Sequence, residues 1–258
     1  MSGEAVPAAR VRLEKDGPVA WIVIDSPENR NALGGPVLHG LVAGLGSALE
    51  DPEVRVVVIT GVGTAFSSGA DLYDTTPSEV VEQAYRDLFE GIVEADKPVV
   101  ARVNGHCLGG AIGLVAVCDL SVAVDDGIFG FTEVRLGRTA TLASVVSLPR
   151  LRPADAAELL LLGNRIDGRR AAEAGLVNEA VDREALDSRV QRIVDDLVAG
   201  APRALANTKR LIREVPTSSS AAAWDLAFEI TRQTDGSPEA VEGTAAFRER
   251  RAPVWPAP

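Results

Sequence analysis

Three short segments contain the residues whose types and spacing could carry out acid–base chemistry. Residues 65–72 and 104–111 are glycine-rich turns, and each follows an apolar, strand-like run. Glycine permits unusual backbone angles and close approach, so each turn can present free backbone N–H groups. Residues 131–133 add one carboxylate, Glu133, beside an apolar stretch. Enolate chemistry requires two amide donors and one carboxylate, because the donors hold a developing oxyanion while the carboxylate moves a proton.

The second turn carries four glycines, Gly105, Gly109, Gly110 and Gly113, ahead of and inside a helix-like run. Their order does not match the G-x-G-x-x-G pattern of a dinucleotide-binding turn. The local sequence leaves two interpretations open. The glycines either allow close helix–sheet packing, or they form an anion or oxyanion site, because free N–H groups and the helix dipole favour negative charge at a helix N-terminus.

The same region also contains serines and a histidine, residue types that can carry nucleophilic catalysis. Ser67 and Ser68 could be nucleophiles, but no G-x-S-x-G pattern surrounds them. The chain has two histidines: His39 is expected on a helix surface, and His106 adjoins the second turn and could line a pocket. A Ser-His-Asp triad has no specific support from the sequence. Asp71 is expected to brace its own turn.

Glu133 lies between Phe131 and Val134, which is an apolar setting for a carboxylate. Burial there would raise its pKa toward the range of a general acid or base. The competing interpretation is an exposed edge glutamate beside Arg135.

Composition narrows the class of protein. The chain has 258 residues, 46% of them apolar, and a formal charge of −11. This length supports one large domain, or one domain with an appendage. No stripe of lysine and arginine is present, so nucleic acid is not expected as a partner. A phosphate-bearing ligand would need local arginines, lysines or helix N-termini to hold it.

The sequence also points to a cytoplasmic protein that does not enter membranes. Apolar stretches such as residues 114–118 fall far short of the roughly 20 residues that span a bilayer. Residues 1–10 show no signal-peptide pattern. Cys107 and Cys118 lie in apolar context without metal-ligand spacing, so we expect reduced core thiols.

The first half of the chain alternates strand and helix patterns, which predicts parallel strands covered by helices. Residues 11–14 and 19–25 flank Gly17-Pro18 and predict a hairpin. After about residue 150, helical patterns dominate, and only residues 176–181 interrupt them as a short strand. The expected strands are 54–60, 99–103 and 120–124, and the expected helices are 37–49, 78–94, 110–117, 153–162, 169–174, 183–198, 202–215, 221–234 and 238–250, with a non-helical tail at 252–258.

The ordered set of motifs resembles the enoyl-CoA hydratase/isomerase family, the crotonase superfamily. Each motif is weak alone, but together they cover most of the chain in one order. The matching segments are residues 26–33, 68–72, 104–110, 118–119, 132–137, 171–177 and 247–253.

The resemblance implies an α/β fold, the crotonase-type ββα spiral, with residues 1–195 as the spiral core and 196–258 as a C-terminal helical region used for trimer contacts. It implies a homotrimer or homohexamer acting on an acyl- or enoyl-CoA thioester. It implies no metal and no cofactor beyond the CoA that the substrate carries.

Residue by residue, the resemblance makes the N–H groups of Ala70 and Gly110 the oxyanion donors and Glu133 the catalytic glutamate. The residues implied to contact the substrate or its CoA part are Arg30, Ala32, Ser68, Gly69, Asp71, Leu72, His106, Gly109 and Thr132.

Two positions depart from the family pattern. Two-glutamate hydratases carry a second glutamate three residues after the oxyanion glycine, where this chain has Gly113. Residues 138–141 stand where a proline-containing loop is commoner, which changes the expected acyl pocket. The chain therefore resembles single-glutamate members. We expect a hydratase; the alternatives are a double-bond isomerase, a thioester hydrolase using Ser67 or Ser68, and a weakly catalytic CoA-binding protein.

Overall fold

A computed structural model describes residues 10–255 of the chain, and its larger sheet contains the strands that the apolar runs predict. The first two strands form the expected antiparallel hairpin, and every other neighbouring pair is parallel. The sheet order is β1-β2-β3-β5-β7-β10. The strands are β1 (Arg10–Asp16), β2 (Val19–Asp25), β3 (Val56–Gly61), β5 (Val99–Val103), β7 (Leu120–Val124) and β10 (Glu179–Val181).

A second, smaller sheet has the order β4-β6-β8-β9. Its strands have three residues or fewer: β4 (Ala65–Ser67), β6 (His106–Leu108), β8 (Ile128–Gly130) and β9 (Ile166–Asp167). Three times in succession, a strand of the large sheet is followed by a strand of the small one. After β3–β4 comes α2 (Ser78–Glu94), and after β5–β6 comes α3 (Gly110–Val117). This repeat is the expected ββα spiral.

The central strand β3 of the large sheet is buried on both faces, and its successive side chains point to opposite faces. Val57 and Ile59 of β3 join the main core, which α1 (Gly35–Glu50), α2 and α3 cover. Val56 and Val58 point the other way and pack against α7 (Leu186–Ala199). Continuous apolar runs, rather than alternating ones, are typical of such doubly covered strands.

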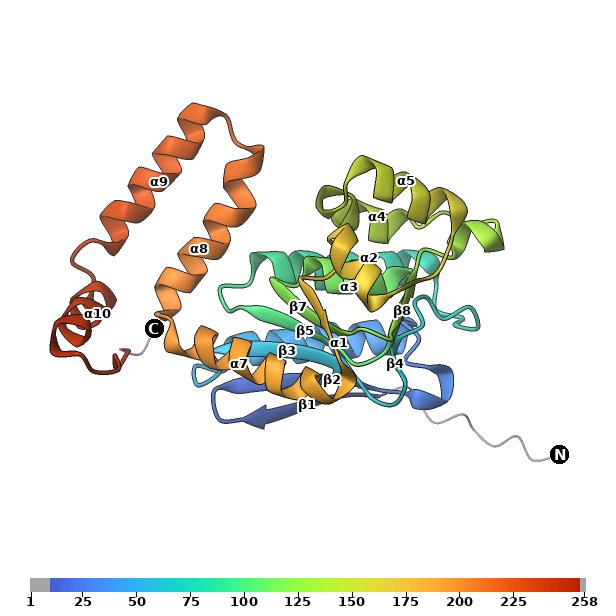
Figure 1. Ribbon diagram of the computed structural model, residues 1–258, viewed down its shortest axis with the longest axis horizontal. Helices are drawn as coiled ribbons and strands as arrows, with labels where there is room; N and C mark the ends of the chain where they lie inside the picture. The colour runs from blue at the N-terminus through green and yellow to red at the C-terminus, as the bar shows by residue number, and fades with distance from the viewer. Residues whose placement is uncertain (1–9, 256–258) are drawn as a thin grey trace.

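The remaining helices surround the core or extend from it. Figure 1 shows α8 and α9 as a hairpin that stands apart from the two sheets. The expected boundary after residue 195 falls inside α7, which packs on the large sheet as far as its last turn. The helices are α4 (Thr141–Ser147), α5 (Pro153–Leu162), α6 (Gly168–Ala174), α8 (Pro202–Glu214), α9 (Ser220–Thr234) and α10 (Pro238–Glu249).

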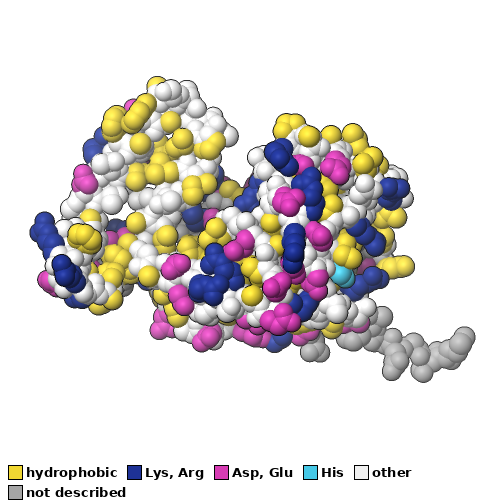
Figure 2. Space-filling model, in the orientation of Figure 1, with side chains coloured by type: hydrophobic (Ala, Val, Ile, Leu, Met, Phe, Trp, Pro, Cys, Tyr) yellow, Lys and Arg dark blue, Asp and Glu magenta, His cyan; other side chains and the backbone are white. Residues whose placement is uncertain are grey.

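One buried cation ties this hairpin to the core. Lys209 of α8 donates to the Asp119 carboxylate (2.7 Å) and to the Lys97 carbonyl oxygen (3.0 Å). Beyond that anchor the hairpin exposes large apolar side chains, including Ile212, Trp224 and Phe228. Figure 2 shows hydrophobic atoms spread over this part of the surface.

Most of the expected elements are confirmed, and the differences are local. The expected helix 183–198 begins with a 3-10 turn, Arg183–Ala185, before α7. Of residues 176–181 only the last three form a strand, because the chain is still turning out of α6 at Leu176, whose N–H donates to the Ala171 carbonyl oxygen (2.9 Å). The helix α4 and the small sheet were not predicted. Residues 1–9 and 256–258, which belong to the signal-peptide and tail expectations, lie outside the described part of the chain.

Within residues 10–255, the structure contains no helix that is both long and apolar enough to cross a membrane. Both cysteines are buried and unpaired, as expected.

Candidate active site

The small sheet brings together the three segments in which the sequence predicts chemistry. Its strands β4, β6 and β8 lie side by side and parallel, with Ser67 paired to Cys107 and Leu108 paired to Gly130. Parallel strands end at the same edge of a sheet. The turn after β4, the turn after β6 and the segment containing Glu133 after β8 therefore lie at one edge.

The first turn packs directly on the second at Gly69. This residue has φ = +84°, and a Cβ built on it would lie 2.5 Å from the Leu108 carbonyl oxygen and 3.5 Å from the Gly110 nitrogen. Only glycine tolerates both the backbone angle and the approach.

The two N–H groups expected to act as donors are free of protein partners in the described chain. Around Ala70, the neighbouring amides are used: Gly69 donates to Ser67 Oγ (3.1 Å), and Asp71 donates weakly to the Leu33 carbonyl oxygen (3.5 Å). Gly110 is the first residue of α3, a position whose N–H has no acceptor within its own helix. Both amides are therefore available to a ligand oxygen.

Gly109 connects the second turn to Glu133. It has φ = +53° and ψ = −123°, and its N–H donates to the Gly130 carbonyl oxygen of the neighbouring strand (3.0 Å). A Cβ on Gly109 would lie 2.5 Å from Glu133 Oε1. The carboxylate thus rests directly on the backbone of the turn that carries the Gly110 amide.

Glu133 begins a short 3-10 helix, Glu133–Leu136, and is half-buried. Its Oε2 is shielded from water and has no hydrogen-bond partner in residues 10–255. Burial raises the pKa of Glu133, and a hydrogen bond from its own backbone N–H opposes this only in part. Arg135 does not pair with it, because that guanidinium donates to the Leu162 carbonyl oxygen (2.9 Å). The edge-glutamate interpretation is therefore wrong.

A cavity of about 200 Å³ opens at this edge. It brings together Ser68, Ala70, Leu72, Gly109, Gly110, Thr132 and Glu133 of the expected set. Residues 138–141, which were expected to shape the acyl pocket, also line it. The lining residues that could not be anticipated come from α2, from the 3-10 helix of Glu133 and from α4: Tyr85, Leu136, Leu142 and Ala143.

The structure also shows what stands at Gly113. A Cβ there would lie 2.9 Å from the ring of Phe89 and 3.0 Å from the Ala143 α-carbon. The space beside this position is therefore filled by apolar groups, and a second carboxylate would not fit without repacking.

The other residues expected to contact CoA, among them Asp71 and His106, are not part of the described lining of this cavity. Arg30 is exposed with φ = +58°, and Ala32 is buried. Asp71 accepts the N–H of Tyr73 (2.9 Å) and so braces its turn, as expected. His106 lies on β6, where its Nδ1 accepts the Ile128 N–H (3.2 Å).

Hydrogen bonds give no support to a serine nucleophile. Ser67 Oγ holds the Gly69 N–H, and Ser68 Oγ donates to the Asn29 carbonyl oxygen (3.3 Å). The imidazole of His106 is engaged elsewhere, so no serine–histidine hydrogen bond links these groups in the described residues.

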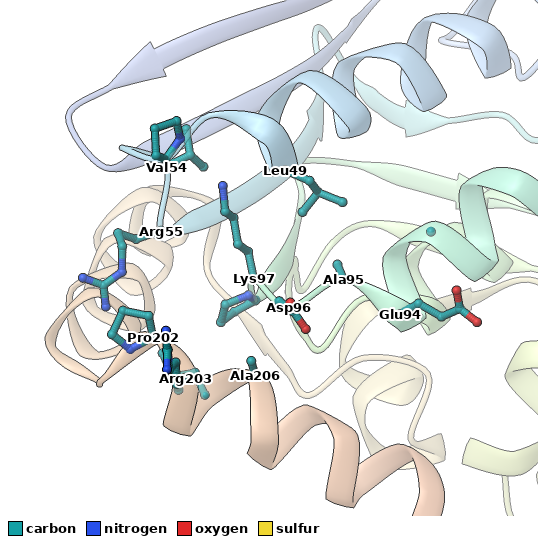
Figure 3. A pocket seen from close by; sticks show the side chains of 14 residues that line it. Leu49, Val54, Arg55, Glu94, Ala95, Asp96, Lys97, Pro202, Arg203 and Ala206 are labelled. Carbon is teal, nitrogen blue, oxygen red and sulfur yellow. The ribbon is translucent and has the colours of Figure 1, made fainter. Parts of the chain in front are cut away.

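A larger cavity, of about 640 Å³, lies at the junction between the core and the start of α8. Figure 3 shows Arg55, Lys97 and Arg203 among its lining side chains. Arg55 donates to the Gly200 carbonyl oxygen (2.6 Å), and Lys97 donates to the Asp51 carbonyl oxygen (2.7 Å). These two cations join segments of the chain, so this cavity offers less chemistry than the smaller one.

Substitution of Gly109 by alanine is expected to destabilise the protein by roughly 1–3 kcal/mol, because the new Cβ meets Glu133 and the backbone angles are strained. The matched control is Gly46→Ala inside α1, where a Cβ meets nothing and alanine should stabilise the helix by about 0.5–1 kcal/mol. Urea unfolding of both variants measures the difference. If G109A were as stable as G46A, the described packing of the turn would be wrong.

Comparisons with known proteins agree with this architecture. Residues 14–258 match the family model described as enoyl-CoA hydratase/isomerase. The chain is 33% identical to a carnitinyl-CoA dehydratase of Citrobacter koseri over 93% of this chain and 96% of that protein. It is 31% identical to an (E)-benzylidenesuccinyl-CoA hydratase of Thauera aromatica over 95% of this chain and 98% of that protein.

Among solved structures, an enoyl-CoA hydratase of Mycobacterium smegmatis superimposes with a TM-score of 0.89 at 30% identity, covering 98% of this chain and 99% of the other. The fold, the matched family model and the relatives agree along almost the whole length of the chain. The protein therefore belongs to the enoyl-CoA hydratase/isomerase family, the crotonase superfamily.

Proposed function

We propose that this protein hydrates the double bond of an enoyl-CoA thioester, with Glu133 transferring the proton. One observation carries the proposal: the half-buried carboxylate of Glu133, whose Oε2 has no partner in residues 10–255, lies against the turn that carries the free Gly110 amide, and both line the same cavity as Ala70. The hydratase and dehydratase names of the relatives support the same reaction class.

In this proposal the thioester carbonyl oxygen accepts hydrogen bonds from the N–H groups of Ala70 and Gly110. Both are held by the backbone before the reaction, so they need no rearrangement when charge develops. A pre-organised donor of this kind typically contributes roughly 3–4 kcal/mol. The N-terminus of α3 adds a favourable dipole.

The proton path needs only one carboxylate. Glu133 takes a proton from water as the water oxygen bonds to the β-carbon, and the electrons of the double bond move onto the thioester oxygen. The resulting enolate collapses as its α-carbon takes the proton back from Glu133. Water is added across the bond, and the carboxylate is regenerated.

The CoA part would extend from the first turn. Arg30 supplies an exposed cation there, and Ser68 and Leu72 line the cavity mouth. Gly69 and Gly109 shape the two turns, and Thr132 precedes the base. Ala32, Asp71 and His106 are proposed as further residues of this surface. Local cations matter because the chain as a whole carries a charge of −11.

A double-bond shift is the second candidate, and a specific observation favours it. Among the described residues, Glu133 is the one carboxylate in the cavity lining, and Phe89 and Ala143 fill the space beside Gly113. A single carboxylate can carry a proton between two carbons of the same enolate without any water.

A panel of 2-enoyl- and 3-enoyl-CoA thioesters, with products separated by chromatography, tests the proposal. Hydroxyacyl products support hydration, and bond-shifted products support the second candidate. Release of free CoA would indicate a thioester hydrolase. Binding without any product would indicate a weakly catalytic CoA-binding protein.

Substitution of Glu133 by glutamine is expected to lower turnover by about 10²–10⁴-fold, because the amide keeps the volume but cannot accept the proton. Binding of the thioester should change less than threefold. The control is Glu50→Gln at the exposed end of α1. Steady-state kinetics and calorimetric titration measure both quantities, and full activity in E133Q would exclude Glu133 as the base.

The pH dependence should follow the same carboxyl group. Burial raises the pKa of Glu133 above the ordinary 4.5, and the reaction needs its deprotonated form. The value of kcat/KM should therefore rise with pH through a midpoint above 4.5, and activity should be lost as pH falls through it. A pH–rate profile of wild type and E133Q checks this, since the acidic limb should vanish in the variant.

We further propose that the α8–α10 region joins copies of the chain in a homotrimer or homohexamer. Trp224 and Phe228 of α9 stack at 5.7 Å between ring centroids, yet they are 62% and 52% exposed. Stacked aromatic side chains left open to water are typical of association surfaces.

The double substitution Trp224→Asp with Phe228→Asp should dissociate the assembly into single chains, because two charges cannot be buried in an apolar contact. Light scattering coupled to size exclusion should give three or six times 27.1 kDa for wild type and 27.1 kDa for the variant. A variant mass equal to that of wild type would place the contact elsewhere.

A further inference from the structure

The most unusual polar group near the cavity is the hydroxyl of Tyr85. Tyr85 lies on α2 and is only 4% exposed. Its hydroxyl oxygen is shielded from water and has no hydrogen-bond partner in residues 10–255. Most buried hydroxyls are paired, because leaving one unpaired is unfavourable. An unpaired phenol at the edge of a cavity therefore indicates a partner that arrives with a ligand.

The hydroxyl of Tyr85 lies against the α-carbon of Gly110. A Cβ built on Gly110 would lie 2.5 Å from the Tyr85 hydroxyl oxygen. The Cα–Cβ bond of a helical residue tilts toward the helix N-terminus. Since Gly110 is the first residue of α3, the hydroxyl stands at the N-terminal end of that helix, beside the free Gly110 amide.

Glu133 occupies the equivalent place one residue earlier. Its Oε1 lies 2.5 Å from the position that a Cβ on Gly109 would occupy. The α-carbons of Gly109 and Gly110 are the two ends of one trans peptide unit, about 3.8 Å apart. The N–H of that unit is the Gly110 amide. The amide is therefore flanked by the carboxylate at one end and the phenol at the other.

The protonation state suits a donor and not a base. Burial, and secondarily the charge of Glu133, raise the pKa of the Tyr85 phenol. The hydroxyl therefore keeps its proton at neutral pH. The phenol has a proton to donate, and no oxygen of residues 10–255 receives it.

We propose that Tyr85 donates a third hydrogen bond to the thioester oxygen, beside the N–H groups of Ala70 and Gly110. This inference rests on the proposed function. It gives the site a neutral donor on α2 in addition to the two backbone amides. Negative charge that develops on the oxygen would then be shared among three donors.

The Tyr85→Phe variant tests this proposal, because it removes one oxygen atom and leaves the ring in place. The ring packs edge-to-face on Phe89, with centroids 5.5 Å apart. Tyr73→Phe is the matched control, since Tyr73 is 93% exposed and is the only other tyrosine of the chain.

Three results are expected for Y85F. Its kcat/KM should fall about 10²-fold or more, as for loss of an oxyanion donor. Its melting temperature without ligand should stay unchanged or rise by about 2–4 °C, because an unpaired buried hydroxyl is gone. The infrared carbonyl band of a bound ¹³C-labelled enoyl-CoA thioester should move back toward its free-solution position. Y73F should match wild type in all three.

The carbonyl band separates this donor role from a packing role. If Y85F kept the wild-type carbonyl shift while losing activity or stability, Tyr85 would be a packing residue and the inference would be wrong. Wild-type kcat/KM in Y85F would overturn it equally. Failure of the proposed function looks different: wild type itself would then show neither turnover nor a carbonyl shift.

Discussion

The close approach of two backbone turns is the constraint on which the rest of the site depends. The turn after β4 touches the turn after β6 at Gly69, where any side chain would meet the Leu108 carbonyl oxygen. The residue before β6 lies just as tightly against the residue before β4. A Cβ on Gly105 would lie 2.0 Å from the Thr64 carbonyl oxygen. Without these contacts, the amides of Ala70 and Gly110 would not open into one cavity. Short strands pairing in parallel bring the turns together, and the missing side chains let them meet.

Two buried asparagines hold the connection that leads into the first turn. Asn31 donates to the carbonyl oxygens of Val62 (2.9 Å) and Ala65 (2.8 Å), and its Oδ1 accepts the Ser26 N–H (2.9 Å). Asn104 donates to the Gly63 carbonyl oxygen (3.0 Å). Irregular backbone has polar groups that need partners. The two amide side chains supply partners for carbonyl oxygens of the loop between β3 and β4, whose Gly63 and Thr64 are exposed, and so hold this loop at a defined position.

Burial raises the pKa of Glu133, and no cationic side chain among the described residues pairs with its carboxylate to oppose this. Many carboxylates of this acidic chain are paired with arginine or lysine, as Asp119 is with Lys209. Glu133 has no such partner in the described chain, and its neighbours are glycine backbone and the Tyr85 phenol. An unpaired carboxylate in partial burial is poised to take a proton, whereas a paired one is not. Phe89 and Ala143 fill the space beside Gly113 and leave Glu133 without a second carboxylate.

Much of the fold and part of the site could be predicted from the sequence, because residues close together in the sequence determine those features. Helical periodicity predicts α2 over residues 78–94, and apolar runs predict β5 and β7, with the observed ends. Glycines that follow apolar, strand-like runs mark both turns, and Glu133 stands out as a charge in an apolar run. The small sheet could not be predicted, because strands of two or three residues carry no periodicity.

The tertiary structure alone decided which side chains share the cavity. Tyr85 looks like one more apolar position on the amphipathic face of α2, and only its contact with Gly110, 25 positions later, gives its hydroxyl a role. The sequence likewise left two interpretations of Glu133 open, a buried base and an exposed edge residue beside Arg135. That choice depended on where Arg135 points, which is toward the carbonyl oxygen of Leu162. Local sequence determines the elements and the unusual residues, whereas contacts between distant segments determine which of those residues meet.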